Sequence, residues 1–273
     1  MCRFNIWLIM MGEGEKISGS TFEIEDEWMT KNFDKLKSLS AKFDKTKFLN
    51  LLIPKAIIRS DYEQFLTEAD FKEIDKKMES KEKEVKECLD KYKELNDPKP
   101  KFLPFLLGYL WYNSLDDKND YLSVVDFSMG DNSQRLYLIN MKSNKVEVNT
   151  TCMQWEWKKW VQTFSNESWS WQSSIGLAVV PMYYKDWNAR SYHPERGKWD
   201  ENLLLRWTEP GFNDNIFDRK IYMHTWNRSQ WCFTLPQTDI WHEVIRKMAS
   251  WGTIMSFYPD ANYLKNTRLL EIS

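Results

Sequence analysis

Glycine, long apolar runs and closely spaced cysteines are all scarce in this chain of 273 residues. It has 9 glycines, where the usual share of about 7% would give roughly 19. The apolar run near the N-terminus, residues 6–11, is shorter than most secretory signal cores and far too short to span a bilayer. The absence of C-x-x-C spacing argues against a structural zinc site or a dense disulfide framework, and leaves a Cys152–Cys232 disulfide open.

The chain also has little net charge. Its formal charge is −2 at pH 7, so it has no global basic field that would attract nucleic acid. Hydrophobic residues make up 42% of the chain, which is enough for a sizeable core. The composition predicts a soluble globular protein with one main domain and an appended segment.

The residues that could carry chemistry are concentrated in residues 223–236, which read MHTWNRSQWCFTLP. His224 is one of three histidines in the chain, and Cys232 is one of four cysteines. A cysteine is a strong nucleophile as the thiolate, which a neighbouring imidazole can generate. We predict a short strand over residues 220–223 that delivers His224, with Cys232 in the loop between this strand and a helix. The alternative is a buried structural cysteine beside an unrelated histidine.

Several short motifs support the first interpretation. In chain order they are Asp126-Phe127-Ser128 with Arg135-Leu136-Tyr137-Leu138, Phe164-Ser165-Asn166 with Ser173-Ser174-Ile175-Gly176, Leu205-Arg206-Trp207 with Phe212-Asn213-Asp214, and Ser229-Gln230-Trp231-Cys232. Over roughly residues 121–258 the chain therefore resembles the murein L,D-transpeptidase catalytic domain family of cysteine transpeptidases. That family has the signature His…Ser-x-Gly-Cys, and Trp231 stands here where the family has glycine.

The resemblance implies a role for each matched position. It makes Cys232 the nucleophile, His224 its general base and Ser229 the third residue of the catalytic motif. It places the oxyanion site at the backbone around Thr225 and Trp231. Substrate contacts are expected from Gln172, Ser173, Ser174, Arg206 and Asn213. A thiolate–imidazolium pair would lower the pKa of the thiol. The family requires no metal or organic cofactor.

Tryptophan is as abundant as glycine is scarce. The chain has 15 tryptophans, and some stand in polar, loop-like runs such as residues 154–160 and 168–172. Trp207, Trp226 and Trp231 fall on glycines of the family that the chain resembles. Our hypothesis is UGA recoding: these codons are UGA, read as glycine in a bacterial source. The alternative is a tryptophan-rich surface that stacks on sugars.

The N-terminal part is predicted to be helical. Apolar residues recur at alternating spacings of three and four from Phe71 to Leu95, with Lys81 as the polar break, which predicts a stripe along one helix and places Cys88 in the core. Because the stripe covers only about three heptads, it favours a hairpin packed on itself or on the catalytic domain over a long coiled coil. Residues 102–112 (FLPFLLGYLWY) are predicted to form a helix that packs against a sheet.

From residue 121 the pattern changes to strands and turns. Strands are expected over residues 121–128, 135–140, 146–150, 175–184, 203–206 and 253–258, with a loop over 186–200 and a helix over 238–250. The predicted fold class is mainly β, a β-sandwich or mixed-sheet catalytic domain with a helical N-terminal segment, α+β overall. The expected divisions are a degenerate or truncated export signal (1–20), a helical region (21–118) and the catalytic domain (119–273).

These expectations together predict a murein L,D-transpeptidase that acts in the cell envelope, outside the cytoplasmic membrane. Its expected partners are peptidoglycan stem peptides, with no nucleic acid and no stable membrane insertion. Two alternatives stay open at this point. One is an L,D-carboxypeptidase, in which water resolves the same acyl-enzyme. The other is a non-catalytic β-domain that binds glycan or cell wall through its tryptophans.

Overall fold

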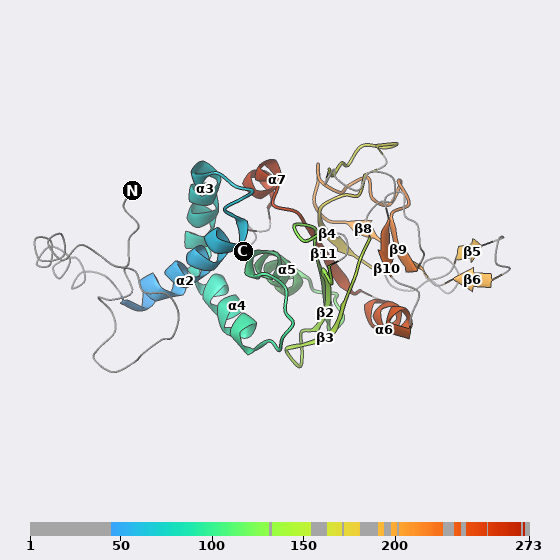
Figure 1. Cartoon of the computed structure of the whole chain (residues 1–273), viewed down its shortest axis with the longest axis horizontal. Coiled ribbons are helices and arrows are strands. Elements are labelled where there is room, and N and C mark those ends of the chain that lie inside the picture. The colour runs from blue at the N-terminus through green and yellow to red at the C-terminus, as the bar shows by residue number, and fades with distance from the viewer. Residues whose placement is uncertain are drawn as a thin grey trace, which may run out of the picture. The chain divides into compact units, whose positions relative to one another are not determined.

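The computed structural model describes residues 45–130, 133–153, 163–170, 172–180, 191–193, 198–200, 202–225, 232–235, 239–249, 251–268 and 270 (Figure 1). The chain divides into two compact units, Met1–Leu49 and Asn50–Ser273. The second unit contains the sheets and nearly all of the described helical residues. The expected export signal at residues 1–20 lies outside the described residues.

Within the described residues, four helices precede the first strand. They are α2 (Lys45–Tyr62), α3 (Glu68–Glu79), α4 (Glu82–Glu94) and α5 (Phe102–Ser114). The single helix expected over the apolar stripe is therefore wrong, because the chain breaks at Ser80, whose hydroxyl donates to the Lys77 carbonyl at 2.7 Å. The stripe itself is buried on both helices, and Cys88 lies in the core as predicted. No helix in the described part of the chain is long and apolar enough to cross a membrane.

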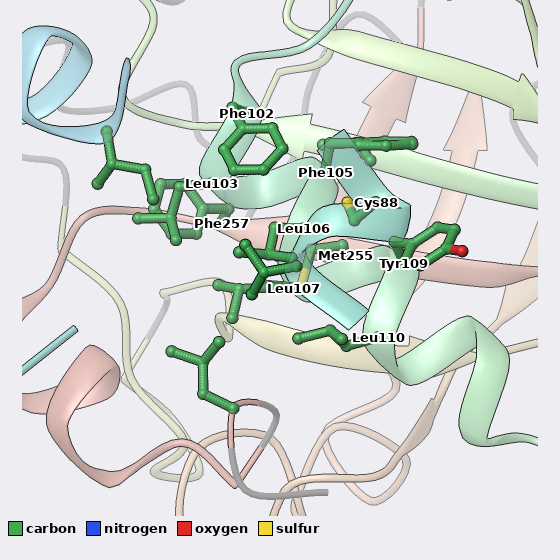
Figure 2. Packing of buried hydrophobic residues seen from close by; sticks show 14 of the residues in the cluster. Cys88, Phe102, Leu103, Phe105, Leu106, Leu107, Tyr109, Leu110, Met255 and Phe257 are labelled. Atoms are coloured by element: carbon green, nitrogen blue, oxygen red, sulfur yellow. The ribbon is translucent and has the colours of Figure 1, made fainter. Parts of the chain in front are cut away.

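Helix α5 packs against the main sheet, as its apolar sequence predicts. Figure 2 shows its side chains gathered with Met255 and Phe257 of the strand β11 (Thr253–Phe257). Gly108 permits this close approach, because a Cβ there would lie 3.1 Å from Leu122 and 3.3 Å from Met255. The helical region and the sheet thus share one hydrophobic core.

The main sheet has six strands in the order β3-β2-β1-β11-β4-β8. Strands β1 (Tyr121–Asp126), β2 (Leu136–Asn140) and β3 (Lys145–Thr150) form the antiparallel meander that the sequence predicts. The last strand, β11, inserts parallel to β1, and β4 (Gly176–Val179) pairs with it antiparallel. Alternate residues of β1 face opposite sides, since Val124 packs with the helices and Val125 packs in a second core.

The second core lies between the other face of the main sheet, helix α6 (Asp239–Met248) and a smaller sheet of order β10-β9-β7. This sheet consists of β7 (Asn202–Leu204), β9 (Tyr222–Thr225) and β10 (Phe233–Leu235). In Figure 1, α6, β9 and β10 are drawn on the side of the main sheet away from α5. The described chain ends in the short helix α7 (Ala261–Asn266), which contacts α3.

Three strand predictions differ from the structure. The strand expected over residues 203–206 is two strands in different sheets, β7 and β8 (Arg206–Trp207). The loop expected over residues 186–200 contains an antiparallel pair, β5 (Ser191–His193) and β6 (Lys198–Asp200). The sequence did not indicate β10, because three residues are too few to show a period. A mixed sheet with helices on both faces makes the fold α+β, and the helices are too large a part of it for a mainly β class.

Candidate active site

His224 lies on β9, Cys232 lies directly before β10, and these two strands pair in parallel. In the register of these strands Met223 faces Phe233 and His224 faces Thr234. Met223 and Phe233 are both buried in the second core. Because side chains alternate along a strand, His224 is on the face of β9 opposite to Met223, and its partner Thr234 lies two residues after Cys232. Strand spacing places the Cα atoms of His224 and Cys232 about 8 Å apart, and the Cys232 thiol contacts the backbone of Lys220 and Tyr222.

The strand that carries Cys232 is positioned from both sides. Cys232 immediately precedes β10, so it lies between two strands and not in the strand-to-helix loop that the sequence predicts. The other edge of β10 forms a bridge with Met153, in which each of Met153 and Thr234 donates its N–H to the other's carbonyl. Backbone pairing on both edges therefore fixes Thr234, which is two residues after Cys232.

The thiol of Cys232 is buried and hydrogen-bonded to the backbone at the start of β9. Its Sγ accepts the Tyr222 N–H at 3.4 Å and lies 3.8 Å from the Lys220 carbonyl oxygen, to which the thiol donates. Burial raises the pKa of the Cys232 thiol to about 12, while the Tyr222 N–H and the charge of Arg219 oppose this rise. The direction is opposite to that expected from a thiolate–imidazolium pair, because loss of solvent outweighs the stabilisation of the thiolate.

Arg219 connects the surroundings of the thiol to the segment that contains three of the expected substrate contacts, Gln172, Ser173 and Ser174. Its guanidinium donates to the Ser165 carbonyl at 2.6 Å, the Ser174 hydroxyl at 2.9 Å and the Ser170 hydroxyl at 3.1 Å. It also donates to the Gln172 carbonyl. Gln172 and Ser174 are thereby held next to the residue whose charge acts on Cys232. Ser173 and Ser174 are themselves buried.

Asn213 and Arg206 have other surroundings. Asn213 is buried, and its amide accepts the N–H groups of Thr208 and Glu209 and donates to the Leu177 carbonyl at 2.7 Å. These bonds favour a structural role at β4 over direct contact with a substrate. Arg206 is exposed on β8, with its guanidinium 5.1 Å from the centroid of the Phe217 ring.

Arg219 and the backbone of β9 are parts of the site that sequence reasoning hardly indicates. In the sequence, Asp218-Arg219 is typical of turn and salt-bridge residues, and the family resemblance slightly favours a structural role near the site. The partners of Arg219 lie 45 to 54 residues away in the sequence, so no local spacing could reveal them. Lys220 has a φ of 53°, and this left-handed residue turns the chain into β9. That turn brings the Lys220 carbonyl and the Tyr222 N–H to the thiol.

Some predicted site residues are outside the described residues. They include Ser229 and Trp231, together with Trp155, Trp157, Trp171 and Trp226 of the recoding hypothesis. For Thr225 and Trp207 the strand is described but the side chain is not. The catalytic role of Ser229 and the oxyanion site around Trp231 therefore stay predictions.

Two other tryptophans have a backbone conformation typical of glycine. Trp169 has a φ of 68° and Trp251 has a φ of 71°. An L-residue in this left-handed region loses about 1–2 kcal/mol to contact between its Cβ and the backbone, whereas glycine does not. Trp169 is also 81% exposed, so no packing compensates for its conformation.

The described cysteines are all free thiols, so the possible Cys152–Cys232 disulfide is not formed. No group of three or more His, Cys, Asp or Glu with metal-binding geometry occurs among the described residues. A family model described as L,D-transpeptidase catalytic domain matches residues 101–257, which is more than half of the chain. The match runs from the residue before α5 to the end of β11. Comparisons with curated proteins and with solved structures found no match.

Proposed function

Because this chain belongs to the L,D-transpeptidase catalytic domain family, we propose that it is a murein L,D-transpeptidase whose nucleophile is Cys232. The observation that supports the proposal is the β9–β10 register, which pairs His224 with Thr234, two residues after Cys232, within the matched residues. Its substrate is then a peptidoglycan stem peptide, and its place of action is outside the cytoplasmic membrane, in the periplasm or at the wall.

The reaction begins with a neutral thiol. His224 removes the proton from Cys232 as the sulfur attacks the carbonyl between the third residue of the stem, a diamino acid, and the terminal D-alanine. Backbone N–H groups around residues 231 and 232 stabilise the oxyanion. The imidazolium returns the proton to the departing amine, so D-alanine leaves and a thioester remains.

An amine of a second stem then resolves the thioester. His224 removes a proton from this amine as it attacks, and the proton passes to the departing sulfur, which regenerates the Cys232 thiol. The product is a cross-link between the third residues of two stems. If water takes the place of the amine, the same intermediate gives a tripeptide stem, which is the L,D-carboxypeptidase alternative.

The proposed activity includes glycine at position 231. Glycine lets the backbone N–H groups approach the oxyanion, whereas an indole would crowd them. The positive φ values of Trp169 and Trp251 support the recoding hypothesis independently of the family signature. Trp251 was not among the tryptophans that the sequence indicated, and it precedes Gly252, where a Cβ would lie 2.4 Å from the Met248 carbonyl oxygen. The gene sequence tests this part directly. UGA codons at 169, 231 and 251 support it, and UGG at these positions rejects it.

Covalent trapping with a carbapenem tests the nucleophile. The protein, made with glycine at the suspected recoded positions, should gain the mass of one carbapenem. Cys232→Ala should gain none, whereas the matched control Cys152→Ala, which removes another buried thiol, should react as the parent does. An adduct of equal yield in Cys232→Ala would end the assignment.

The products distinguish the two enzymatic alternatives. Purified muropeptide tetrapeptides should give dimers linked between third residues if an amine is the acceptor. Tripeptide monomers alone would make the protein a carboxypeptidase. Wall binding that survives Cys232→Ala without either product would instead favour the non-catalytic glycan-binding domain.

A further inference from the structure

Arg219 stands at the end of the turn that leads into β9, between the proposed nucleophile and the segment of residues 165–174. Its N–H donates to the Asn215 carbonyl at 2.9 Å, which closes a helical turn before the left-handed Lys220. The guanidinium is largely buried. This backbone geometry fixes the base of the Arg219 side chain on the same stretch that hydrogen-bonds to the Cys232 thiol.

The hydrogen bonds of the Arg219 guanidinium hold residues 165–174 but do not neutralise the positive charge of Arg219. They go to two backbone carbonyls and two serine hydroxyls, all four of which are neutral acceptors. Ser165 and Ser174 are themselves connected, because the Ser174 hydroxyl donates to the Ser165 carbonyl at 3.1 Å. A buried arginine whose bonds go to neutral groups keeps its positive charge available to a nearby anion.

The anion that forms nearby is the sulfur of Cys232. Among the described side chains of β9 and its preceding turn, Arg219 and Tyr222 interact electrostatically with this thiol, and His224 lies two residues after Tyr222 on the same strand. Tyr222 is partly buried and its pKa is raised, so it stays neutral at physiological pH. Lys220 contributes its carbonyl, and its side chain is exposed. Arg219 is therefore the permanent positive charge of this group.

We propose that Arg219 is a positioning residue of this site, which clamps residues 165–174 and stabilises the Cys232 thiolate as His224 takes its proton. The part that concerns acyl transfer rests on the proposed function. The two actions are separable, because the clamp needs the shape of the guanidinium and the stabilisation needs only its charge.

Three variants separate the two actions. Arg219→Gln removes the charge and most of the clamp, Arg219→Lys keeps the charge but not the fork of donors, and Ser174→Ala removes one clamp bond only. Hydrogen exchange of residues 163–175 reports the clamp and should increase in all three variants. The alkylation rate of Cys232 by iodoacetamide between pH 7 and 10 reports the thiolate.

The expected thiol result distinguishes charge from structure. Loss of a nearby positive charge raises a thiol pKa by about one unit or more. The thiolate fraction then falls about tenfold, while the more basic thiolate is about threefold more reactive. Arg219→Gln should therefore be alkylated about threefold more slowly at each pH. Arg219→Lys and Ser174→Ala should keep the parent profile, as should Arg246→Gln, which removes an exposed arginine of α6.

The proposal is overturned if Cys232 in Arg219→Gln is alkylated at the parent rate across this pH range. It is also overturned if Arg219→Lys slows the alkylation as much as Arg219→Gln does. If Arg219→Gln does not fold, Arg219→Lys alone decides. An unchanged pH profile of Cys232 alkylation together with faster hydrogen exchange in Arg219→Lys supports the proposal. A shifted pH profile of alkylation in that variant contradicts it. Iodoacetamide needs no transpeptidase activity, so this result stands even if the parent protein fails to react with a carbapenem. Carbapenem acylation that is normal in Arg219→Gln would instead leave the proposed function intact and remove Arg219 from it.

Discussion

The protein contains two buried thiols with closely similar electrostatics and different surroundings, Cys152 and Cys232. Burial raises the pKa of each to about 12, and each has an arginine whose charge opposes this rise, Arg135 for Cys152 and Arg219 for Cys232. Both lie next to β10, since Cys152 precedes the residue that bridges to Thr234 and Cys232 precedes the strand itself.

The difference lies in what else each thiol meets. Arg135 is fully buried, lies 4.7 Å from the centroid of the Phe127 ring and donates to the carbonyls of Cys152 and Met129. Cys232 lies directly before the strand that pairs with the strand of His224, and its arginine donates to residues 165–174. In the proposed function, burial and a cation do not make a nucleophile by themselves. The proposed base, His224, is what distinguishes Cys232 from Cys152.

The largest expected effect comes from removing the base. His224→Ala should make Cys232 resemble Cys152, because no group then accepts the thiol proton during attack. Loss of a general base lowers a rate by about 10²–10⁴-fold, and we expect a decrease of this size in carbapenem acylation followed by intact mass. His242→Ala, on α6, should retain the parent rate. If His224→Ala also retains it, His224 is not the base.

The next effect concerns pH and compares the two thiols in the free protein. Because the pKa of each is about 12, both are protonated from pH 7 to 10, and the thiolate fraction rises tenfold with each pH unit. Iodoacetamide alkylation of Cys232, measured by mass spectrometry after digestion, should therefore rise through this range without a plateau, and Cys152 should follow the same slope. A plateau for Cys232 below pH 9 would mean a preformed thiolate–imidazolium pair, as the sequence alone suggested.

The smallest effect concerns Trp169 and Trp251, whose backbone conformation is typical of glycine. Replacing Trp169 or Trp251 by glycine relieves a left-handed L-residue, and each change should raise the free energy of unfolding by about 1 kcal/mol. The matched control is Trp111→Gly in helix α5, where glycine should lower it by about 1 kcal/mol or more. Urea denaturation measures both. Destabilisation at 169 and 251 as large as at 111 would remove the structural support for recoding.

The two sides of the main sheet also differ in how far the sequence predicts them. Helix α5, the burial of Cys88 and the β1–β3 meander follow from apolar runs and alternation that are local in the chain. The break between α3 and α4 was missed because the spacing of the stripe continues through Ser80 and Lys81. Strands β8 and β10 have two and three residues, too few for a periodic signal.

For the site, sequence motifs indicated the histidine and the cysteine but not what holds them. The contacts of Arg219 join parts of the chain that are 45 to 54 residues apart, so no alternation or local spacing indicates them. The strands β9 and β10 are too short for a periodic signal, so their register was not predictable either. The left-handed φ of Trp251 belongs to the turn after α6, and no sequence period marks it.

The role of Cys232 as the nucleophile is best tested by comparing both thiols within one protein. The parent, with glycine at the suspected recoded positions, is incubated with a carbapenem, quenched, denatured and alkylated, and the peptides that contain Cys152 and Cys232 are examined by mass spectrometry. We expect the carbapenem on the Cys232 peptide and an alkyl group on Cys152. A carbapenem on Cys152, or alkyl groups alone on both cysteines, would contradict it.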